Sequence, residues 1–388
     1  MFAALLPHVI VIALCGMSVA QDLGVPLSWR KFNNSRPTSE RISISQNAIN
    51  TILPQLDSST GQFNGIGYWQ AANVFSAMAL QDQVAKTTTN KNIVVNNLKL
   101  VFGLFKNYDQ FGWWAQAAHY AFKSYGDTEL LNNSIATWNS VSNYMITPAQ
   151  AQAGKTPFKS FALAGTCDGV TMAGGVFWRP TTDDTAINSI TTGLSSYLYE
   201  TTRDTKYLSA ATMAANWIKA HNIATSSASN PGILLDTEDG DNCSRSPASW
   251  LFTYNSGKFL EGLSVLANVT GDSQWEQLML TTAAAAIKNA PWQGSNGIII
   301  EGADTDSNND GVGFKGTGLL EVFRRTPQNS ALRILIHSYV DVQYNALLDL
   351  ASSGNDYSAN WLGPQPSGFT TWGQLAALDV LVAAVEAN

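Results

Sequence analysis

Aromatic and polar side chains occur together at six places in this sequence, and at each place a helix is expected to begin. The six groups are Gly67, Tyr68, Trp69 and Gln70; residues 108–114, which read Tyr-Asp-Gln-Phe-Gly-Trp-Trp; Asp183 and Asp184; Phe252, Thr253, Tyr254 and Asn255; Phe314, Lys315 and Gly316; and Thr371 with Trp372. Aromatic faces stack on sugar rings, while amides and carboxylates bind sugar hydroxyls. A single group of this kind would be typical of core packing. Their recurrence favours a groove that binds an extended sugar chain.

The elements that would position these groups are helical hairpins. Three similar turns, Gly126-Asp127-Thr128, Arg203-Asp204-Thr205 and Gly271-Asp272-Ser273, each lie between two segments with helical periodicity. The aspartate or threonine is suited to cap the helix that follows. Strand-like alternation is rare, so an architecture of alternating strands and helices is disfavoured.

Six hairpins can be placed in this way. The expected inner helices span 68–80, 113–122, 187–199, 259–269, 312–323 and 372–385, and the expected outer helices span 44–53, 94–105, 130–141, 207–218, 275–287 and 331–348. Alternating inner and outer helices without a dividing linker predict one all-α domain, a closed α/α toroid of six hairpins.

The N-terminus is typical of a signal peptide. An apolar run over residues 9–14 is followed by Ser18 and Ala20, small residues at the positions expected before a cleavage site. We therefore expect residues 1–20 to be removed and residues 21–388 to form the secreted domain, in the extracellular space or the cell wall. The run is too short to span a membrane, and no later segment is long enough. Four possible N-glycosylation sites, at Asn33, Asn132, Asn242 and Asn268, agree with export by a eukaryotic route.

Two cysteines remain after that cleavage, Cys167 and Cys243. In an exported protein such a pair favours a disulfide over two free thiols. The bridge would stabilise the fold by about 4 kcal/mol on the chain-entropy model.

Composition excludes several classes of function. Only 13% of the residues are charged and the net charge is −7, which disfavours a nucleic acid partner because phosphate binding needs clustered lysine and arginine. The 12 tryptophans and 12 tyrosines instead suit an uncharged polysaccharide. No nucleophilic serine motif, phosphate loop or zinc motif is found, and His119, His221 and His337 lack metal-ligand spacing. We expect no cofactor and no metal site, and a monomer.

One acidic loop partly resembles a calcium site. Asp306, Asn308, Asp310 and Gly311 have the spacing of an EF-hand loop, but Thr317 stands where the bidentate glutamate is required. An ordinary acidic loop is favoured over calcium binding.

Four of these groups, those at residues 67–70, 108–114, 253–255 and 314–316, resemble glycoside hydrolase family 76, the endo-α-1,6-mannanases and their fungal cell-wall relatives. The resemblance covers most of the mature chain and also includes Thr166-Cys167 and the segment Gly174-Gly175-Val176-Phe177-Trp178. It implies an α/α toroid, action on α-1,6-mannosidic bonds with retention of configuration, and a bridge between Cys167 and Cys243. It also implies substrate contacts, for which the candidates are Trp69, Tyr108, Trp113, Trp114, Tyr254, Asn255, Asp310 and Lys315.

The family places two consecutive aspartates before Gly-Trp-Trp, the first as nucleophile and the second as general acid and base. Here the first corresponds to Asp109 and the second to Gln110. An amide cannot deliver a proton, and loss of a positioned acid and base slows a reaction roughly 10²- to 10⁴-fold. Asp184 could substitute as the acid, but we favour helix capping for Asp183 and Asp184. The sequence therefore predicts a mannan-active glycosidase or transglycosidase that is weakened at Gln110, with a catalytically inactive mannan-binding wall protein as the alternative.

Overall fold

The computed structural model describes residues 21–105, 111–189, 192–224, 231–247, 250, 252–289, 293–300 and 314–387, with the backbone alone at residues 111, 289 and 314–317. The predicted signal peptide lies outside the described residues. So do Tyr108, Asp109, Gln110 and Asp310, whose predicted roles therefore remain predictions.

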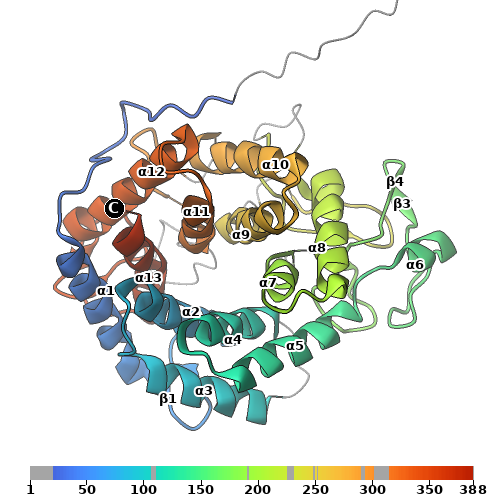
Figure 1. Cartoon of the computed structure of the whole chain (residues 1–388), viewed down its shortest axis with the longest axis horizontal. Helices are drawn as coiled ribbons and strands as arrows, with labels where there is room; N and C mark the ends of the chain where they lie inside the picture. Colours follow the sequence, from blue (N-terminus) through green and yellow to red (C-terminus); the bar gives the residue numbers. More distant parts are fainter. Residues whose placement is uncertain are drawn as a thin grey trace, which may run out of the picture.

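Six inner helices form a closed ring (Figure 1). They are α2 (Tyr68–Ala85), α4 (Phe111–Tyr125), α7 (Thr192–Thr202), α9 (Thr253–Thr270), α11 (Phe314–Arg325) and α13 (Thr371–Glu386). Each packs against the next in this order, and α13 packs against α2 to close the ring. The predicted α/α toroid is therefore confirmed.

Six outer helices surround this ring and return the chain from one inner helix to the next (Figure 1). They are α1 (Thr38–Ile52), α3 (Lys91–Leu104), α5 (Thr128–Ser142), α8 (Thr205–Trp217), α10 (Ser273–Ala284) and α12 (Ala331–Leu350), while the short α6 (Pro148–Ala153) projects outside the ring. Asp127, Asp204 and Asp272 cap α5, α8 and α10, because each carboxylate accepts a hydrogen bond from the backbone N–H two residues later. The capping role predicted for these turns is confirmed.

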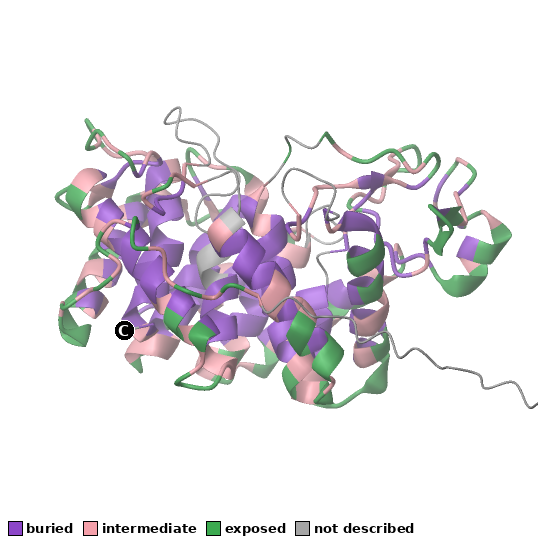
Figure 2. Cartoon of the chain, turned by 90° about the horizontal axis from the view of Figure 1, so that it is seen from above, coloured by how far each residue is buried: buried purple, intermediate pink, exposed green. Residues whose placement is uncertain are grey.

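Burial distinguishes the two sets of helices (Figure 2). Every residue of α13 from 373 to 385 is buried, whereas α8 buries a stripe that includes Tyr207, Ala210 and Ala214. Small residues let the inner helices approach closely: a Cβ added to Gly318 of α11 would lie 2.0 Å from the carbonyl oxygen of Gly257 in α9. Among the described residues, no helix is long and apolar enough to cross a membrane.

Strands are few and short, and one of them corrects a predicted helix. The described strands are β1 (Leu56–Asp57), β2 (Gln62–Phe63), β3 (Thr166–Cys167), β4 (Val170–Thr171), β5 (Ala186–Ile187), β6 (Glu238–Asp239), β7 (Ser352–Ser353) and β8 (Asp356–Tyr357), paired in antiparallel twos. The prediction of an inner helix from residue 187 is wrong, because Ile187 pairs with Glu238 in β6 and α7 begins only at Thr192.

Ion pairs join the inner helices near their C-terminal ends. Arg325 of α11 lies 2.7 Å from Glu200 of α7, and Arg324 lies 2.6 Å from Glu321 and 2.5 Å from Glu386 of α13. Burial raises the pKa of Glu200, but its hydrogen bond and attraction to Arg325 outweigh burial and hold that pKa below its usual range. These ion pairs link the C-terminal ends of α7, α11 and α13.

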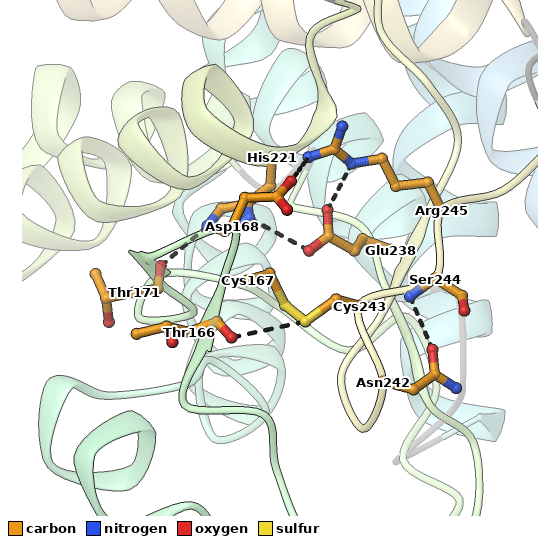
Figure 3. Close-up of a disulfide and its surroundings, with 10 residues drawn as sticks. All are labelled: Thr166, Cys167, Asp168, Thr171, His221, Glu238, Asn242, Cys243, Ser244 and Arg245. Carbon is orange, nitrogen blue, oxygen red and sulfur yellow. Dashed lines mark hydrogen bonds and ion pairs between the residues drawn. A yellow bond between two sulfur atoms is a disulfide. The ribbon is translucent and has the colours of Figure 1, made fainter.

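A disulfide joins Cys167 to Cys243, with the two Cα atoms 5.6 Å apart (Figure 3). The predicted bridge is therefore present. Beside it, the fully buried Glu238 lies 3.3 Å from His221 and 3.1 Å from Arg245, which also reaches Asp168. The bridge ties the β3–β4 hairpin to the segment that leads into α9.

Candidate functional site

The first residues of the inner helices gather at one end of the ring. Each inner helix is followed by an outer helix that runs back antiparallel to it, so successive inner helices point in the same direction. Long connecting segments lie along one edge of the molecule (the upper edge in Figure 2). Side chains near the starts of different inner helices can therefore meet, which is how a toroid brings distant parts of a sequence into one site.

Three aromatic side chains meet at this end of the ring and form what we call the aromatic cluster: Trp69 of α2, Trp113 of α4 and Tyr254 of α9. The ring centroids of Trp69 and Trp113 are 5.0 Å apart, and that of Tyr254 lies 6.1 Å from Trp69 and 5.9 Å from Trp113. All three side chains are partly exposed. Because α7 separates α4 from α9 in the ring, the cluster reaches across the centre of the toroid.

A buried lysine contacts the aromatic cluster from the interior of the ring of helices. Lys258 lies four residues after Tyr254 on α9, so the two side chains share one face of the helix. The Lys258 side chain is only 4% exposed. The ammonium lies 5.3 Å from the centroid of Trp113 and 3.1 Å from a carboxylate oxygen of Glu261. The positive charge is thus placed between an aromatic face and a carboxylate, both of which attract it.

Glu261 is the centre of a buried hydrogen-bond network that joins three inner helices. It is fully buried and accepts hydrogen bonds from Gln116 Nε2 at 2.9 Å, from the Tyr197 hydroxyl at 2.8 Å and from the Tyr120 hydroxyl. Burial and the nearby Glu261 carboxylate raise the pKa of Tyr120 and of Tyr197 well above their usual range, so both hydroxyls keep the proton they donate. A buried carboxylate with this set of donors and a lysine is well compensated, and it fixes α4, α7 and α9 relative to each other.

Asp236 is a carboxylate beside the cluster that sequence reasoning missed. Its Oδ1 accepts hydrogen bonds from the Tyr254 hydroxyl at 2.7 Å and from Asn255 Nδ2 at 2.9 Å. Asn188 Nδ2 bonds the backbone oxygen of Asp236 at 2.8 Å and Asn255 Oδ1 at 3.0 Å. Asp236 is half-buried, and its Oδ2 has no hydrogen-bond partner in the part of the chain that the structure describes. That oxygen is suited to accept a hydrogen bond from a ligand hydroxyl.

The toroid agrees with a comparison of sequences. Residues 45–387 match the sequence model of glycosyl hydrolase family 76. The chain belongs to this family. No curated protein sequence matches it.

Solved structures of family 76 proteins share the fold. An inactive variant of the α-1,6-mannanase GH76A of Salegentibacter sp. HEL1_6, in complex with α-1,6-mannotriose, has a TM-score of 0.73 at 16% identity, over 90% of this chain and 100% of that one. The family 76 α-mannanase BT2949 of Bacteroides thetaiotaomicron has a TM-score of 0.61 at 15% identity, over 91% of this chain and 96% of that one. Dfg5 of Chaetomium thermophilum, in complex with glucosamine, has a TM-score of 0.67 at 13% identity, over 92% of each chain. At these identities the likeness establishes the fold alone.

The structure separates the predicted binding residues into two groups. Trp69, Trp113 and Tyr254 come together at the partly exposed surface. Trp114 is fully buried, and its ring packs 5.1 Å from that of Tyr68 and 5.9 Å from that of Phe75 in the core. Asn255 is also fully buried, between Asp236 and Asn188. Both residues lie where they hold neighbouring side chains, not where a ligand could reach them in this conformation.

Asp183 and Asp184 do not begin a helix, so the predicted capping of an inner helix is wrong. They lie in a turn that precedes β5, because the pairing of β5 with the distant β6 holds this segment extended. Asp184 Oδ1 accepts hydrogen bonds from Trp178 Nε1 at 3.0 Å and from the backbone N–H of Ala186 at 3.1 Å. Its carboxylate is engaged with an indole, which the sequence did not indicate.

The side chains of the remaining predicted residues lie outside what the structure describes. Lys315 lies in the first turn of α11, where the backbone alone is described, and the acidic loop 304–311 lies outside the described residues. Within the described ranges, one grouping of possible metal ligands is found, Cys167 with Glu238 and Cys243. Both of its sulfurs form the disulfide, so they do not offer thiolates to a metal.

Proposed function

We propose that this family 76 protein is a secreted glycoside hydrolase or transglycosidase that acts on α-1,6-linked mannan with retention of configuration. The observation that carries the proposal is the aromatic cluster of Trp69, Trp113 and Tyr254, with Asp236 beside it. Partly exposed rings offer faces to sugar units, and the carboxylate offers an acceptor to their hydroxyls. A protein of similar structure supports the choice of substrate, since it is an α-1,6-mannanase variant in complex with α-1,6-mannotriose.

Asp109 is the proposed nucleophile. It precedes the first residue of α4 by two positions and Trp113 by four. Its carboxylate would form a bond to the anomeric carbon as the bond from that carbon to the glycosidic oxygen breaks. Water or a second sugar would then release the glycosyl group. The aligned starts of the inner helices would favour a carboxylate at this end, because helix N-termini carry partial positive charge.

Gln110 limits the first of these steps. The departing oxygen needs a proton, and a glutamine amide cannot supply it at ordinary pH. We expect cleavage of unactivated mannan to be roughly 10²- to 10⁴-fold slower than with a carboxylic acid at this position. The second candidate function, a catalytically inactive mannan-binding protein of the cell wall, is favoured by this one residue.

Two substrates tested in parallel separate these functions. The purified protein is incubated with an α-1,6-mannooligosaccharide and with a mannosyl fluoride, whose leaving group needs no protonation. Cleavage of the fluoride alone, abolished in Asp109→Ala, would indicate an intact nucleophile without its acid. Cleavage of both would indicate a replacement acid. Binding without cleavage of either would overturn the enzymatic proposal in favour of the binding protein.

A matched pair of variants tests the proposed residues. Gln110→Asp restores the family pair, and we expect it to accelerate cleavage of the oligosaccharide much more than cleavage of the fluoride. Gln110→Glu places an acid with a longer side chain at the same position. It is the control that shows whether the position of the carboxyl group matters. An equal, small effect of Gln110→Asp on both substrates would contradict the assignment of this position.

A further inference from the structure

Trp178 is a large aromatic side chain exposed on the surface, and polar contacts fix its ring. It is 40% exposed. Its indole N–H donates a hydrogen bond to Asp184 Oδ1 at 3.0 Å, and the guanidinium carbon of Arg179 lies 3.8 Å from the centroid of the ring. The edge and one face of the indole are thus occupied by protein groups.

The segment that contains Arg179 and Asp184 is fixed by hydrogen bonds from Lys159. The ammonium of Lys159 donates hydrogen bonds to the backbone oxygens of Arg179 at 3.0 Å, Thr181 at 2.7 Å and Asp184 at 2.7 Å. Lys159 is only 9% exposed, so these bonds are shielded from water. Trp178 is therefore held in one orientation before any ligand arrives, which reduces the entropy lost on binding.

Backbone hydrogen bonds connect the segment of Trp178 to a residue that contacts Asp236 beside the aromatic cluster. The N–H of Trp178 bonds the backbone oxygen of Ala186, and the N–H of Asn188 bonds that of Val176. Asn188 in turn contacts Asp236 beside the cluster. Ala186 and Asn188 are two residues apart along an extended segment, which is a separation of about 7 Å, and the contacts to Trp178 and to Asp236 add to it. A chain bound at the cluster could reach the indole through its neighbouring units.

The surroundings of Trp178 suit a sugar better than a protein partner. The next exposed residues along the chain are Thr181, Thr182 and Asp183, all polar. The buried core of a protein interface is usually more apolar than the rest of the surface. An oriented ring followed along the chain by hydroxyls and a carboxylate matches the surface of a pyranose, which has an apolar face and a polar rim.

We propose that Trp178 is a stacking platform for a distal, uncharged sugar unit of the bound chain, and that Asp184 and Arg179 are positioning residues that orient its ring. This inference rests on the proposed function, because it extends the same binding site. It gives Asp184 a role different from that of a substitute acid.

Affinity measured against chain length tests the platform. Linear α-1,6-mannooligosaccharides of increasing length are titrated by calorimetry into the wild-type protein, Trp178→Ala and Ile334→Ala. The last is a control, because Ile334 is an exposed apolar residue of the outer helix α12. We expect Trp178→Ala to weaken binding of the longer chains about three- to tenfold and to leave the shortest bound chain unchanged. Ile334→Ala should match wild type at every length.

Variants of Asp184 separate the two roles for its carboxylate. Asp184→Asn keeps an oxygen that can accept from the indole N–H, so it should bind long chains more tightly than Asp184→Leu does. Asp184→Leu removes the acceptor and should weaken binding of long chains as Trp178→Ala does. Loss of turnover in Asp184→Asn with unchanged affinity would overturn the positioning role and indicate an acid.

The failure of this inference can be distinguished from failure of the proposed function. If Trp178→Ala binds every length as tightly as wild type does, the platform is overturned while binding at the cluster stands. If wild type binds no mannooligosaccharide at all, the proposed function is overturned, and the platform with it. Circular dichroism of each variant verifies that the fold is retained.

Discussion

His119 makes the stability of the toroid depend on pH in a predictable direction. The side chain lies on the inner helix α4, is fully buried, and has its ring 5.1 Å from that of Tyr197 and 6.2 Å from that of Phe122. Burial lowers its pKa from 6.5 to about 3, helped by the charge of Lys123 and opposed by that of Glu200. The imidazole therefore stays neutral in the folded protein down to strongly acidic pH.

The shifted pKa of His119 makes the free energy of unfolding fall as the pH is lowered. In the unfolded chain the imidazole takes up a proton below about pH 6.5, so between pH 6.5 and about 3 the unfolded state binds more protons than the folded state. The stabilising contribution of the neutral ring is present above this window and is lost as pH falls through it, at about 1.4 kcal/mol per pH unit. Between pH 7 and pH 4.5 the loss amounts to about 2.5 kcal/mol.

A comparison with His119→Leu isolates this contribution. Leucine has a similar volume and does not titrate, while all other groups titrate in both proteins and cancel in the difference. Urea unfolding followed by circular dichroism at pH 7, 6, 5 and 4.5, with the disulfide oxidised, should show the variant gaining about 2.5 kcal/mol relative to wild type across the series. If the two free energies of unfolding change in parallel to within about 0.5 kcal/mol, the imidazole is not held neutral and the reasoning is wrong.

Three further predictions concern the frame of the site. Glu261→Ala leaves a buried ammonium and three other donors without their shared acceptor, and should lower the free energy of unfolding by about 3–5 kcal/mol in the same urea assay. Gly262→Ala places a Cβ 2.7 Å from the backbone nitrogen of Gly193 between α9 and α7, and should cost about 1–3 kcal/mol. Its matched control, Gly103→Ala, meets nothing within 4 Å in α3, and should stabilise by about 0.5–1 kcal/mol. Reduction of the disulfide should lower the free energy of unfolding by about 4 kcal/mol, measured with and without reductant.

The hairpins of the toroid were predictable because their signals are local. Asp127, Asp204 and Asp272 cap helices through bonds to residues two positions away, so a short stretch of sequence contains the whole interaction. The start of α7 was not predictable in this way. The segment around Ile187 pairs with Glu238 some fifty residues later, and such a pairing leaves no pattern in the segment itself.

The site was predictable only in part for a similar reason. Aromatic residues at helix starts indicated Trp69, Trp113 and Tyr254, since the repeated hairpins imply that these starts meet. Asp236 lies in an irregular segment without periodicity, and its partners come from elsewhere in the chain. The adjacent Trp113 and Trp114 could have been separated, because consecutive residues of a helix point about 100° apart.

The proposed function assigns binding and bond cleavage to different residues. The aromatic cluster is supported by the buried pair of Lys258 and Glu261, and Asp236 is oriented by Tyr254 and Asn255. On the proposed function, glutamine at position 110 removes the proton donor of the reaction, whereas other residues hold the aromatic cluster and Asp236. The proposed function therefore predicts that the glutamine lowers turnover more than it lowers affinity for the polysaccharide, and that Gln110→Asp should raise turnover with little change in affinity.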